Sequence, residues 1–253
     1  MELICLGLNH RTAPVDVRER FAVAEPKLGE ASGRLRALDG LAEGVVISTC
    51  NRTEYYAVTD DPAAGLAVLR EHFKGQAGAA LGPEHLYDRS ETEVAWHLCR
   101  VVSGMDSMVL GETEIFGQVK RAYKAALEAG HTSGLLNKLF QRAFTVGKKV
   151  RTATGIQIGQ TSVGSVAVDL AEKIFGHLRS SRVMVIGAGE MSRITAQSLL
   201  SRGANSIFVA NRSYDRAEAL AEELGGQAVR FDDWHLVLQE VDVVISSTGA
   251  PHA

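Results

Sequence analysis

Residues 45–58 read Val-Val-Ile-Ser-Thr-Cys-Asn-Arg-Thr-Glu-Tyr-Tyr-Ala-Val, an apolar run followed by a polar cluster and a second run rich in Tyr and Val. This pattern predicts two strands that meet at a short loop, with Cys50 at its tip. A thiol beside Arg52, among loop N–H groups and short hydroxyl side chains, is expected to favour the reactive thiolate. The alternative is a small buried core cysteine. Lone cysteines are more often of this second kind, but the polar neighbours on both sides argue against an apolar pocket and keep the nucleophile as a hypothesis.

The composition predicts a soluble chain of two domains. With 253 residues, 45% apolar and 23% charged, the chain can bury one large core or two ordinary ones. We expect domains at residues 1–156 and 157–253. The net charge of −3 gives no global attraction to nucleic acid, so any such contact must come from local patches.

The three cysteines, Cys5, Cys50 and Cys99, are widely spaced and form no C-x-x-C pair. Neither a disulfide framework nor a metal site is therefore expected, and a reducing, cytoplasmic setting fits. The first residues carry too short an apolar run for a signal peptide, and no later segment approaches a membrane span.

The first domain is predicted to have ferredoxin-like order. Strands are expected at residues 3–8, on both sides of Cys50 and at 86–87, with helices at 15–21, 25–38 and 62–73 between them. That β-α-β-β-α-β order is typical of a split βαβ unit. Helices are then predicted at 91–102, 115–129 and 135–150.

Two features of this helical region are candidates for the site. His97, in the first of these helices, is the predicted ionisable partner of a distant nucleophile, because Cys and His need only meet in space. The alternative is a helix histidine with a local hydrogen bond. Residues 103–114 are dense in Gly, hydroxyl and acidic residues, which suits polar ligand contacts but also an ordinary helix connection.

Residues 182–192 read Arg-Val-Met-Val-Ile-Gly-Ala-Gly-Glu-Met-Ser. An apolar strand entering a G-x-G turn and then a helix, with a second strand at 206–210, is a Rossmann fingerprint. Gly187 is expected to allow the tight turn and Gly189 the close approach of a pyrophosphate at the helix N-terminus. Ser192 stands where the third glycine or alanine is usual, and is small enough to keep the helix close.

The end of that second strand distinguishes the cofactors. Asn211 and Arg212 stand where NAD enzymes commonly place an acidic residue that holds the ribose hydroxyls. Arg212 can pair with a 2′-phosphate, so NADP(H) is favoured. The alternative is an exposed arginine unrelated to any ligand.

Four motifs together resemble the glutamyl-tRNA reductase family: Gly7-Leu8-Asn9-His10-Arg11-Thr12-Ala13-Pro14, Ser48 to Glu54, Ser103-Gly104-Met105-Asp106-Ser107 through Gly117-Gln118-Val119, and Gly187 to Ser192. The resemblance implies Cys50 as nucleophile and His97 as an activity-critical residue. It implies glutamate recognition by Thr49, Asn51, Arg52, Ser107, Glu112, Thr113, Glu114 and Gln118. It implies NADPH binding by Gly187, Ala188, Gly189, Glu190, Met191 and Ser192, alongside the Asn211 and Arg212 inferred above.

The resemblance also implies a fold and a reaction. The expected fold is α/β, with a ferredoxin-like α+β catalytic domain, added helices and then a partial Rossmann NADP-binding domain. The expected reaction is NADPH-dependent reduction of glutamyl-tRNA(Glu) to glutamate-1-semialdehyde through a Cys50 thioester, the first step of tetrapyrrole biosynthesis. Handover of the aldehyde to glutamate-1-semialdehyde aminomutase is a possible further contact.

Two departures qualify the resemblance. Family members often carry Gln where Glu114 stands, which puts that substrate contact in doubt. The family has a long helix and a C-terminal dimerisation domain, both absent here, so we expect a shortened chain whose full-length form is a homodimer. An NADP-dependent dehydrogenase of a small hydroxy or keto acid, and a binding-only homologue that holds NADPH or tRNA, remain alternatives.

Overall fold

A computed structural model of the protein describes residues 1–77, 81–157 and 163–247, with only the backbone described at Ala77, Val163 and Glu190. The chain divides into two compact units, residues 1–159 and 160–253.

The first unit contains one four-stranded sheet. Its strands are β1 (Glu2–Asn9), β2 (Leu41–Ser48), β3 (Arg52–Thr59) and β4 (Tyr87–Ser90). Its helices are α1 (Val15–Arg18), α2 (Leu28–Arg36), α3 (Pro62–Ala77), α4 (Thr92–Val102), α5 (Glu114–Glu128) and α6 (Gly134–Ala153). The sheet is antiparallel with the order β2-β3-β1-β4, which confirms the ferredoxin-like prediction. The last strand begins one residue later than expected and is longer.

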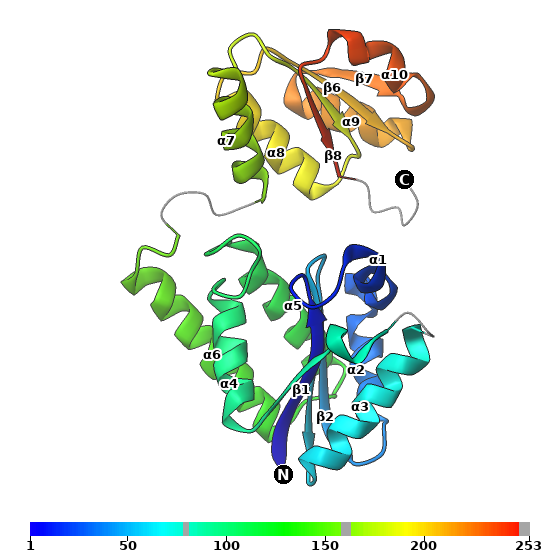
Figure 1. The fold of residues 1–253 in the computed structure, drawn as a ribbon, viewed down its shortest axis with the longest axis vertical. Coiled ribbons are helices and arrows are strands. Elements are labelled where there is room, and N and C mark those ends of the chain that lie inside the picture. Colours follow the sequence, from blue (N-terminus) through cyan, green and yellow to red (C-terminus); the bar gives the residue numbers. More distant parts are fainter. Residues whose placement is uncertain (78–80, 158–162, 248–253) are drawn as a thin grey trace. The chain divides into compact units, whose positions relative to one another are not determined.

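Helices cover both faces of this sheet, which Figure 1 shows edge-on with α2 and α3 on one side and α4 and α6 on the other. Successive residues of a strand point to opposite faces. Tyr55 accordingly packs on Phe73 of α3, with ring centroids 4.4 Å apart, while Tyr56 packs on Phe140 of α6 at 5.6 Å. All eight residues of β3 are therefore buried.

A buried carboxylate attaches β2 to the start of α6. Glu43, 3% exposed, accepts hydrogen bonds from the backbone N–H groups of Ser133, Leu135 and Leu136 at 2.7, 3.1 and 3.1 Å. The first N–H groups of a helix have no partner within the helix, and negative charge is favourable there. Glu43 thus replaces a local cap and fixes α6 against the sheet.

The second unit contains a four-stranded parallel sheet. Its elements are α7 (Val163–Phe175), β5 (Arg182–Ile186), α8 (Glu190–Ser201), β6 (Ser206–Asn211), α9 (Tyr214–Leu224), β7 (Gln227–Arg230), α10 (Trp234–Val237) and β8 (Val243–Ser246). The strand order is β7-β6-β5-β8, with the predicted glycine turn directly after the inner strand β5. This is the expected Rossmann arrangement. Its core is formed by apolar side chains such as Val183, Val185, Ile207 and Val209.

None of the helices in the described ranges has both the length and the apolar character needed to cross a bilayer.

Candidate active site

Cys50 lies exposed at the tip of the turn between β2 and β3, as the sequence predicts. The Thr49 N–H donates to the carbonyl of Arg52 at 2.8 Å, and Thr49 Oγ1 accepts the N–H groups of Asn51 and Arg52 at 3.2 Å each. The threonine hydroxyl therefore satisfies the amides of the turn and sets its shape. Any contact of Thr49 with a substrate stays a prediction.

Two neighbouring segments hold this turn from outside. The N–H of His10, just after β1, donates to the carbonyl of Asn51 at 2.9 Å. Arg18 of α1 donates to Asn51 Oδ1 at 3.2 Å and to the carbonyl of Cys50 at 3.4 Å. Asn51 thus has a structural role in placing the thiol.

The electrostatic environment of Cys50 contradicts the expectation that Arg52 favours its thiolate. Loss of surrounding water raises the pKa of the Cys50 thiol, and the carboxylates of Glu112 and Glu114 raise it further, against a lowering by Arg18. In this state the thiol is mostly protonated at neutral pH. The physical reason is that the Arg52 guanidinium lies among other carboxylates.

Arg52 is buried beneath the turn, with its side chain 1% exposed. Its Nη1 donates to Glu54 Oε1 at 2.7 Å, and its Nη2 donates to Asp106 at the carbonyl, 2.6 Å, and at Oδ2, 3.1 Å. Burial alone would lower the pKa of Arg52, but Glu54 and Asp106 raise it. Arg52 therefore joins β3 to the segment after α4.

Glu54 is the centre of a buried polar cluster that the motifs above did not assign. Fully buried, it accepts hydrogen bonds from Arg52, from the hydroxyls of Tyr56 and Tyr87 at 2.8 and 2.5 Å, and from His97 Nε2 at 2.8 Å. Burial alone would raise the pKa of Glu54, but Arg52 and His97 hold it far below its usual range. One sequence signal was available: Arg52 and Glu54 are two residues apart, so both charges face the same side of a buried strand.

This cluster fixes the orientation of His97. An ionised carboxylate only accepts hydrogen bonds, so His97 Nε2 must carry the hydrogen shared with Glu54, which leaves Nδ1 for other contacts. The ring is buried and lies edge-on to Tyr87, with centroids 5.4 Å apart. Within the described residues no hydrogen bond joins His97 to Cys50.

Gly7 makes the cluster sterically possible. In the sheet register it lies opposite Glu54 on one side and Tyr87 on the other. A Cβ at this position would lie 2.8 Å from Glu54 Cγ and 2.9 Å from the carbonyl oxygen of Thr53. A side chain at residue 7 would therefore displace Glu54.

The segment after α4 forms a closed loop above the start of β3. Gly104 and Gly111 both have left-handed backbone, with φ of 76° and 80°, and the Gly111 N–H donates to the Gly104 carbonyl at 2.9 Å. Ser107 lies within this loop, and its buried Oγ has no hydrogen-bond partner in the part of the chain that the structure describes. An orphaned buried hydroxyl suits a ligand contact.

The remaining predicted glutamate-binding residues surround the start of α5. Glu112 and Glu114 lie close enough to act on the Cys50 thiol. Gln118 lies one turn along α5 from Glu114 and is half-buried, whereas Thr113 is exposed. Their substrate contacts stay predictions.

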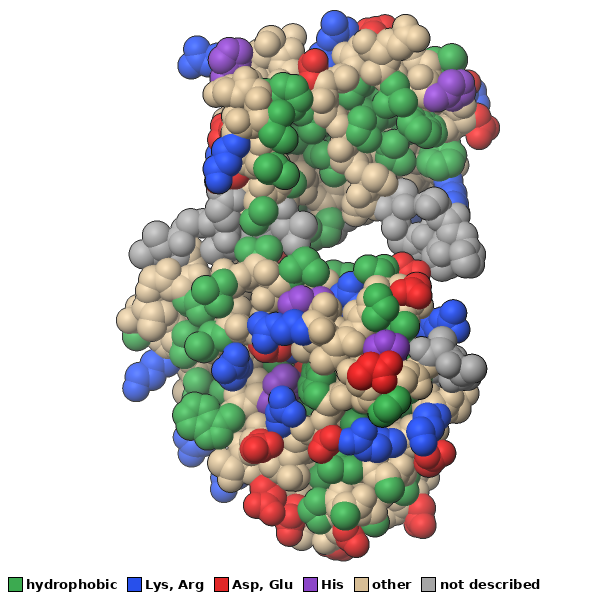
Figure 2. Space-filling model, viewed as in Figure 1, with side chains coloured by type: hydrophobic (Ala, Val, Ile, Leu, Met, Phe, Trp, Pro, Cys, Tyr) green, Lys and Arg blue, Asp and Glu red, His purple; other side chains and the backbone are tan. Residues whose placement is uncertain are grey.

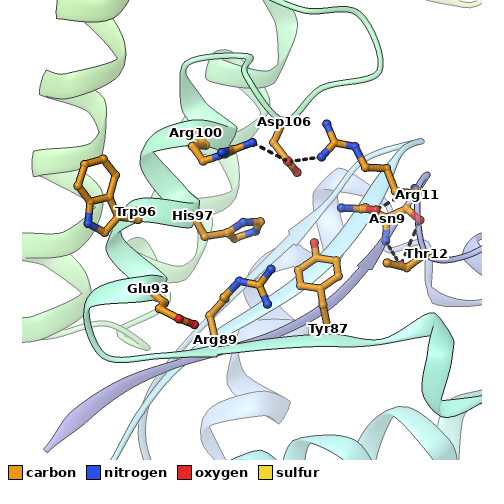
Figure 3. Close-up of a pocket in the computed structure, with 10 residues that line it drawn as sticks. All are labelled: Asn9, Arg11, Thr12, Tyr87, Arg89, Glu93, Trp96, His97, Arg100 and Asp106. Carbon is orange, nitrogen blue, oxygen red and sulfur yellow. Dashed lines mark hydrogen bonds and ion pairs between the residues drawn. The ribbon is translucent and has the colours of Figure 1, made fainter.

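A cavity of about 510 Å³ beside Asp106 is lined by residues of β4 and α4 and by residues at the end of β1 and just after it (Figure 3). Arg11 and Arg100 approach Asp106 Oδ1 from opposite sides, at 3.0 and 4.0 Å. His97 and Tyr87 line the cavity, whereas Cys50 does not. The volume is in the range of small-molecule sites, roughly 300–1,000 Å³.

In the second unit, the turn after β5 has the features expected of a dinucleotide loop. Gly187 has a φ of 104°, a conformation that favours glycine, and its N–H donates to the Ala210 carbonyl at 2.8 Å. A Cβ at Gly189 would meet open space. Helix α8 begins directly after Gly189, and no described side chain caps its first N–H groups, which suits a phosphate there.

The other predicted cofactor residues differ in their surroundings: one is hydrogen-bonded to the glycine turn, one is exposed, and others are partly or fully buried. Asn211 Oδ1 accepts the Ala188 N–H at 3.3 Å, which links the end of β6 to the glycine turn. Arg212 is exposed, with its guanidinium 5.9 Å from the centre of the Phe231 ring. Met191 is half-buried, and Ser192 is fully buried within the unit. Only the backbone of Glu190 is described.

Each of the two units matches a known protein family. Residues 6–154 match the family described as "Glutamyl-tRNAGlu reductase, N-terminal domain", and residues 169–253 match "Shikimate / quinate 5-dehydrogenase". The chain is 55% identical over its full length to a glutamyl-tRNA reductase of Akkermansia muciniphila, of which it covers 74%. It is 44% identical to one of Trichlorobacter lovleyi, of which it covers 59%.

A solved structure, glutamyl-tRNA reductase from Methanopyrus kandleri, aligns with 98% of this chain at 37% identity and a TM-score of 0.58. The chain covers 59% of that protein. It therefore spans between 59% and 74% of the length of these three relatives. On the full-length identity and the matched N-terminal domain, the chain belongs to the glutamyl-tRNA reductase family.

Proposed function

We propose that this protein reduces the glutamyl group of glutamyl-tRNA(Glu) to glutamate-1-semialdehyde with NADPH, the first step of tetrapyrrole biosynthesis, through a thioester on Cys50. One observation carries the proposal: an exposed cysteine at a rigid turn, faced by Glu112 and Glu114 and close to a loop with an orphaned serine hydroxyl. The name shared by its relatives supplies the substrate class.

In the first step, Cys50 Sγ forms a bond to the ester carbonyl carbon and the bond from that carbon to the ribose oxygen breaks. The ribose oxygen leaves with a proton, and the glutamyl group stays on sulfur as a thioester. NADPH, when bound, supplies the hydride that reduces this thioester to the aldehyde. Sulfur then recovers its proton.

Because the pKa of Cys50 is raised in the free protein, binding of the substrate can help to activate the thiol. The α-amino group of an esterified glutamate is a cation near neutral pH, and Glu112 and Glu114 are suited to receive it. Once paired, these carboxylates repel the thiolate less, so the pKa of Cys50 falls when substrate binds. The nucleophile is thus activated in the presence of its substrate.

His97 and Arg52 act from the buried cluster. With Nε2 held by Glu54, His97 offers Nδ1 to a proton from the substrate side. Arg52 is already paired with Glu54 and Asp106. It therefore binds the γ-carboxylate of the substrate either as a third carboxylate beside these two or by releasing one of them.

The residues of the second unit fit a dinucleotide phosphate. Gly187, Gly189 and the uncapped start of α8 would hold the pyrophosphate, and Arg212 the 2′-phosphate. Replacement of Arg212 by Asp is expected to weaken NADPH binding far more than NADH binding. Calorimetric titration of both nucleotides measures this, and equal losses would remove Arg212 from the 2′-phosphate.

The decisive experiment mixes the protein, without NADPH, with tRNA charged with labelled glutamate. Label is expected on the Cys50 peptide through a bond cleaved by hydroxylamine, and it should disappear in Cys50→Ser while NADPH binding persists. If neither this chain nor a version extended to the length of its relatives forms the adduct, the reaction is not a thioester one, and a small-molecule dehydrogenase or a binding protein is the better assignment. Dimerisation and handover to an aminomutase stay predictions.

A further inference from the structure

The cavity beside α4 shares a wall with the Cys50 turn. Arg11 and Thr12, which line it, belong to the segment after β1, and His10 of that segment is hydrogen-bonded to Asn51, the residue after Cys50. Asp106 closes the same side of the cavity and immediately precedes Ser107. The segment that contacts the Cys50 turn through His10 therefore also forms a wall of this cavity through Arg11 and Thr12.

The cavity carries an excess of positive charge. Arg11, Arg89 and Arg100 line it, against the two carboxylates of Asp106 and Glu93. The charge of Asp106 is also shared with the buried Arg52. Figure 2 shows blue basic side chains on the face of this unit that carries α4, interspersed with red acidic ones.

Arg89 is the cation best suited to an incoming anion. Its guanidinium donates a hydrogen bond to the carbonyl of Asp88 at 2.5 Å and lies over the face of Tyr87, with 5.5 Å from Cζ to the ring centre. Among the described residues no carboxylate forms an ion pair with it. Figure 3 shows its guanidinium directed into the cavity between Tyr87 and His97. A planar guanidinium held in this way suits a phosphate group.

The cavity also has an exposed aromatic wall. Trp96 is 70% exposed, although large aromatic side chains usually bury most of their surface. Glu93, Trp96 and Arg100 lie three and four residues apart on α4 and so share one helix face. An open indole beside arginines is the combination with which proteins hold single-stranded nucleic acid, one base stacked and its phosphate paired.

We propose that this cavity binds the 3′-terminal nucleotide of the RNA, with the base against Trp96 and the phosphate at Arg89. The inference rests on the proposed function and deepens it. An amino acid esterified to the terminal ribose is attached directly to that nucleotide, so the nucleotide must lie beside the carbonyl that Cys50 attacks. The cavity is the neighbouring space with matching charge and an aromatic face.

The test uses nucleotide fragments and the whole chain. The protein has two tryptophans, so in Trp234→Phe the fluorescence comes from Trp96 alone. The probes are the trinucleotide CCA, 5′-AMP, adenosine and inorganic phosphate. CCA and 5′-AMP are expected to quench Trp96 saturably, whereas adenosine and phosphate bind at least about tenfold more weakly, because each satisfies only half of the site.

Variants then identify the contacts, with 5′-AMP affinity measured by calorimetry in the presence of saturating NADPH, which occupies the dinucleotide site proposed for the second unit. Trp96→Ala is expected to weaken binding about tenfold, as for loss of one stacked base, and Trp96→Phe to restore most of it. Arg89→Gln weakens binding and reduces its salt dependence. Arg34→Gln, at an exposed arginine of α2, is the matched control and leaves the affinity unchanged.

The outcomes separate this inference from the proposed function. If the Cys50 adduct forms but neither Trp96→Ala nor Arg89→Gln alters 5′-AMP affinity, the nucleotide lies elsewhere and the inference is wrong. If inorganic phosphate binds as tightly as 5′-AMP, the cavity is a simple anion site, and the inference is also wrong. If 5′-AMP binds with the expected losses but no adduct forms, the thioester proposal fails while the nucleotide site stands.

Discussion

The sheet of the first unit buries charge at its centre, whereas the sheet of the second unit buries hydrocarbon. Glu54 and Arg52 on β3 are fully enclosed and paired with each other, with Asp106 and with His97. On β5 and β6 the equivalent interior positions are occupied by residues such as Val185 and Ile207. The first unit therefore holds a charged cluster inside its sheet, whereas the predicted cofactor residues of the second unit lie at the ends of its strands.

The largest expected effect comes from removing one charge of the buried cluster. Glu54→Ala leaves Arg52 enclosed without its nearest carboxylate, which typically costs about 3–5 kcal/mol. Ile207→Val, in the apolar sheet, should cost only about 0.5–1.5 kcal/mol. Urea unfolding measures both, with Trp96 reporting the first unit in Trp234→Phe and Trp234 reporting the second in Trp96→Phe. Equal losses in the two units would mean that the cluster contributes no more than ordinary packing.

Acid should weaken the first unit through the same residue. Because the folded pKa of Glu54 is lowered, its carboxylate stabilises the fold above the ordinary glutamate pKa of about 4.3, and this contribution declines as pH falls below that value. The stability advantage of the native chain over Glu54→Gln should therefore shrink between pH 6 and pH 3.5. A difference that stays constant across this range would show that the ionised form is not what stabilises the cluster.

A smaller effect is expected on the reactivity of Cys50. Replacing Glu112 and Glu114 by Gln removes two carboxylates that raise the pKa of the thiol, so alkylation by iodoacetamide at pH 7.5 should accelerate about threefold. Mass spectrometry of the Cys50 peptide measures the rate. Glu128→Gln, an exposed acid at the end of α5, is the matched control. An unchanged alkylation rate in the double variant would show that these carboxylates do not affect the pKa of the thiol.

The smallest effect is expected from a buried hydroxyl of the second unit that lacks a hydrogen-bond partner among the described residues. Ser192 is fully enclosed on α8, and its Oγ has no partner within the described ranges. Ser192→Ala should change the unfolding free energy by less than about 1 kcal/mol, in the stabilising direction, because it removes an unsatisfied polar group. A clear destabilisation in the Trp234 signal would indicate that this hydroxyl has a partner in solution.

The sequence was sufficient for the architecture because the architecture follows local patterns. Alternating and apolar runs predicted the hairpin at Cys50, and the G-x-G turn predicted the Rossmann order around β5. Helix α2 is shorter than predicted, since residues 25–27 form a separate 3-10 turn that contains Pro26. Such differences move an element boundary without changing the fold.

The polar cluster was not predictable in the same way. Its members come from β3, β4, α4 and the loop after it, and no local rule brings Glu54, Tyr87 and Asp106 together. The neighbours of Arg52 in the sequence suggested an effect on the thiol, whereas its neighbours in space direct its charge inward. The sequence thus identified the residue types of the site, and only the fold showed how their charges pair.

Gly7 shows that a position without a functional group can still determine the geometry of a polar cluster. Its bare backbone provides the space through which Glu54 reaches Tyr87 and His97 across the central strand. In a saturation mutagenesis screen scored by activity, residue 7 should therefore be as intolerant of substitution as Cys50 and His97. Every side chain placed at this position should abolish activity. Reading such a screen as a map of reactive groups would misassign it, because what this position supplies is empty volume.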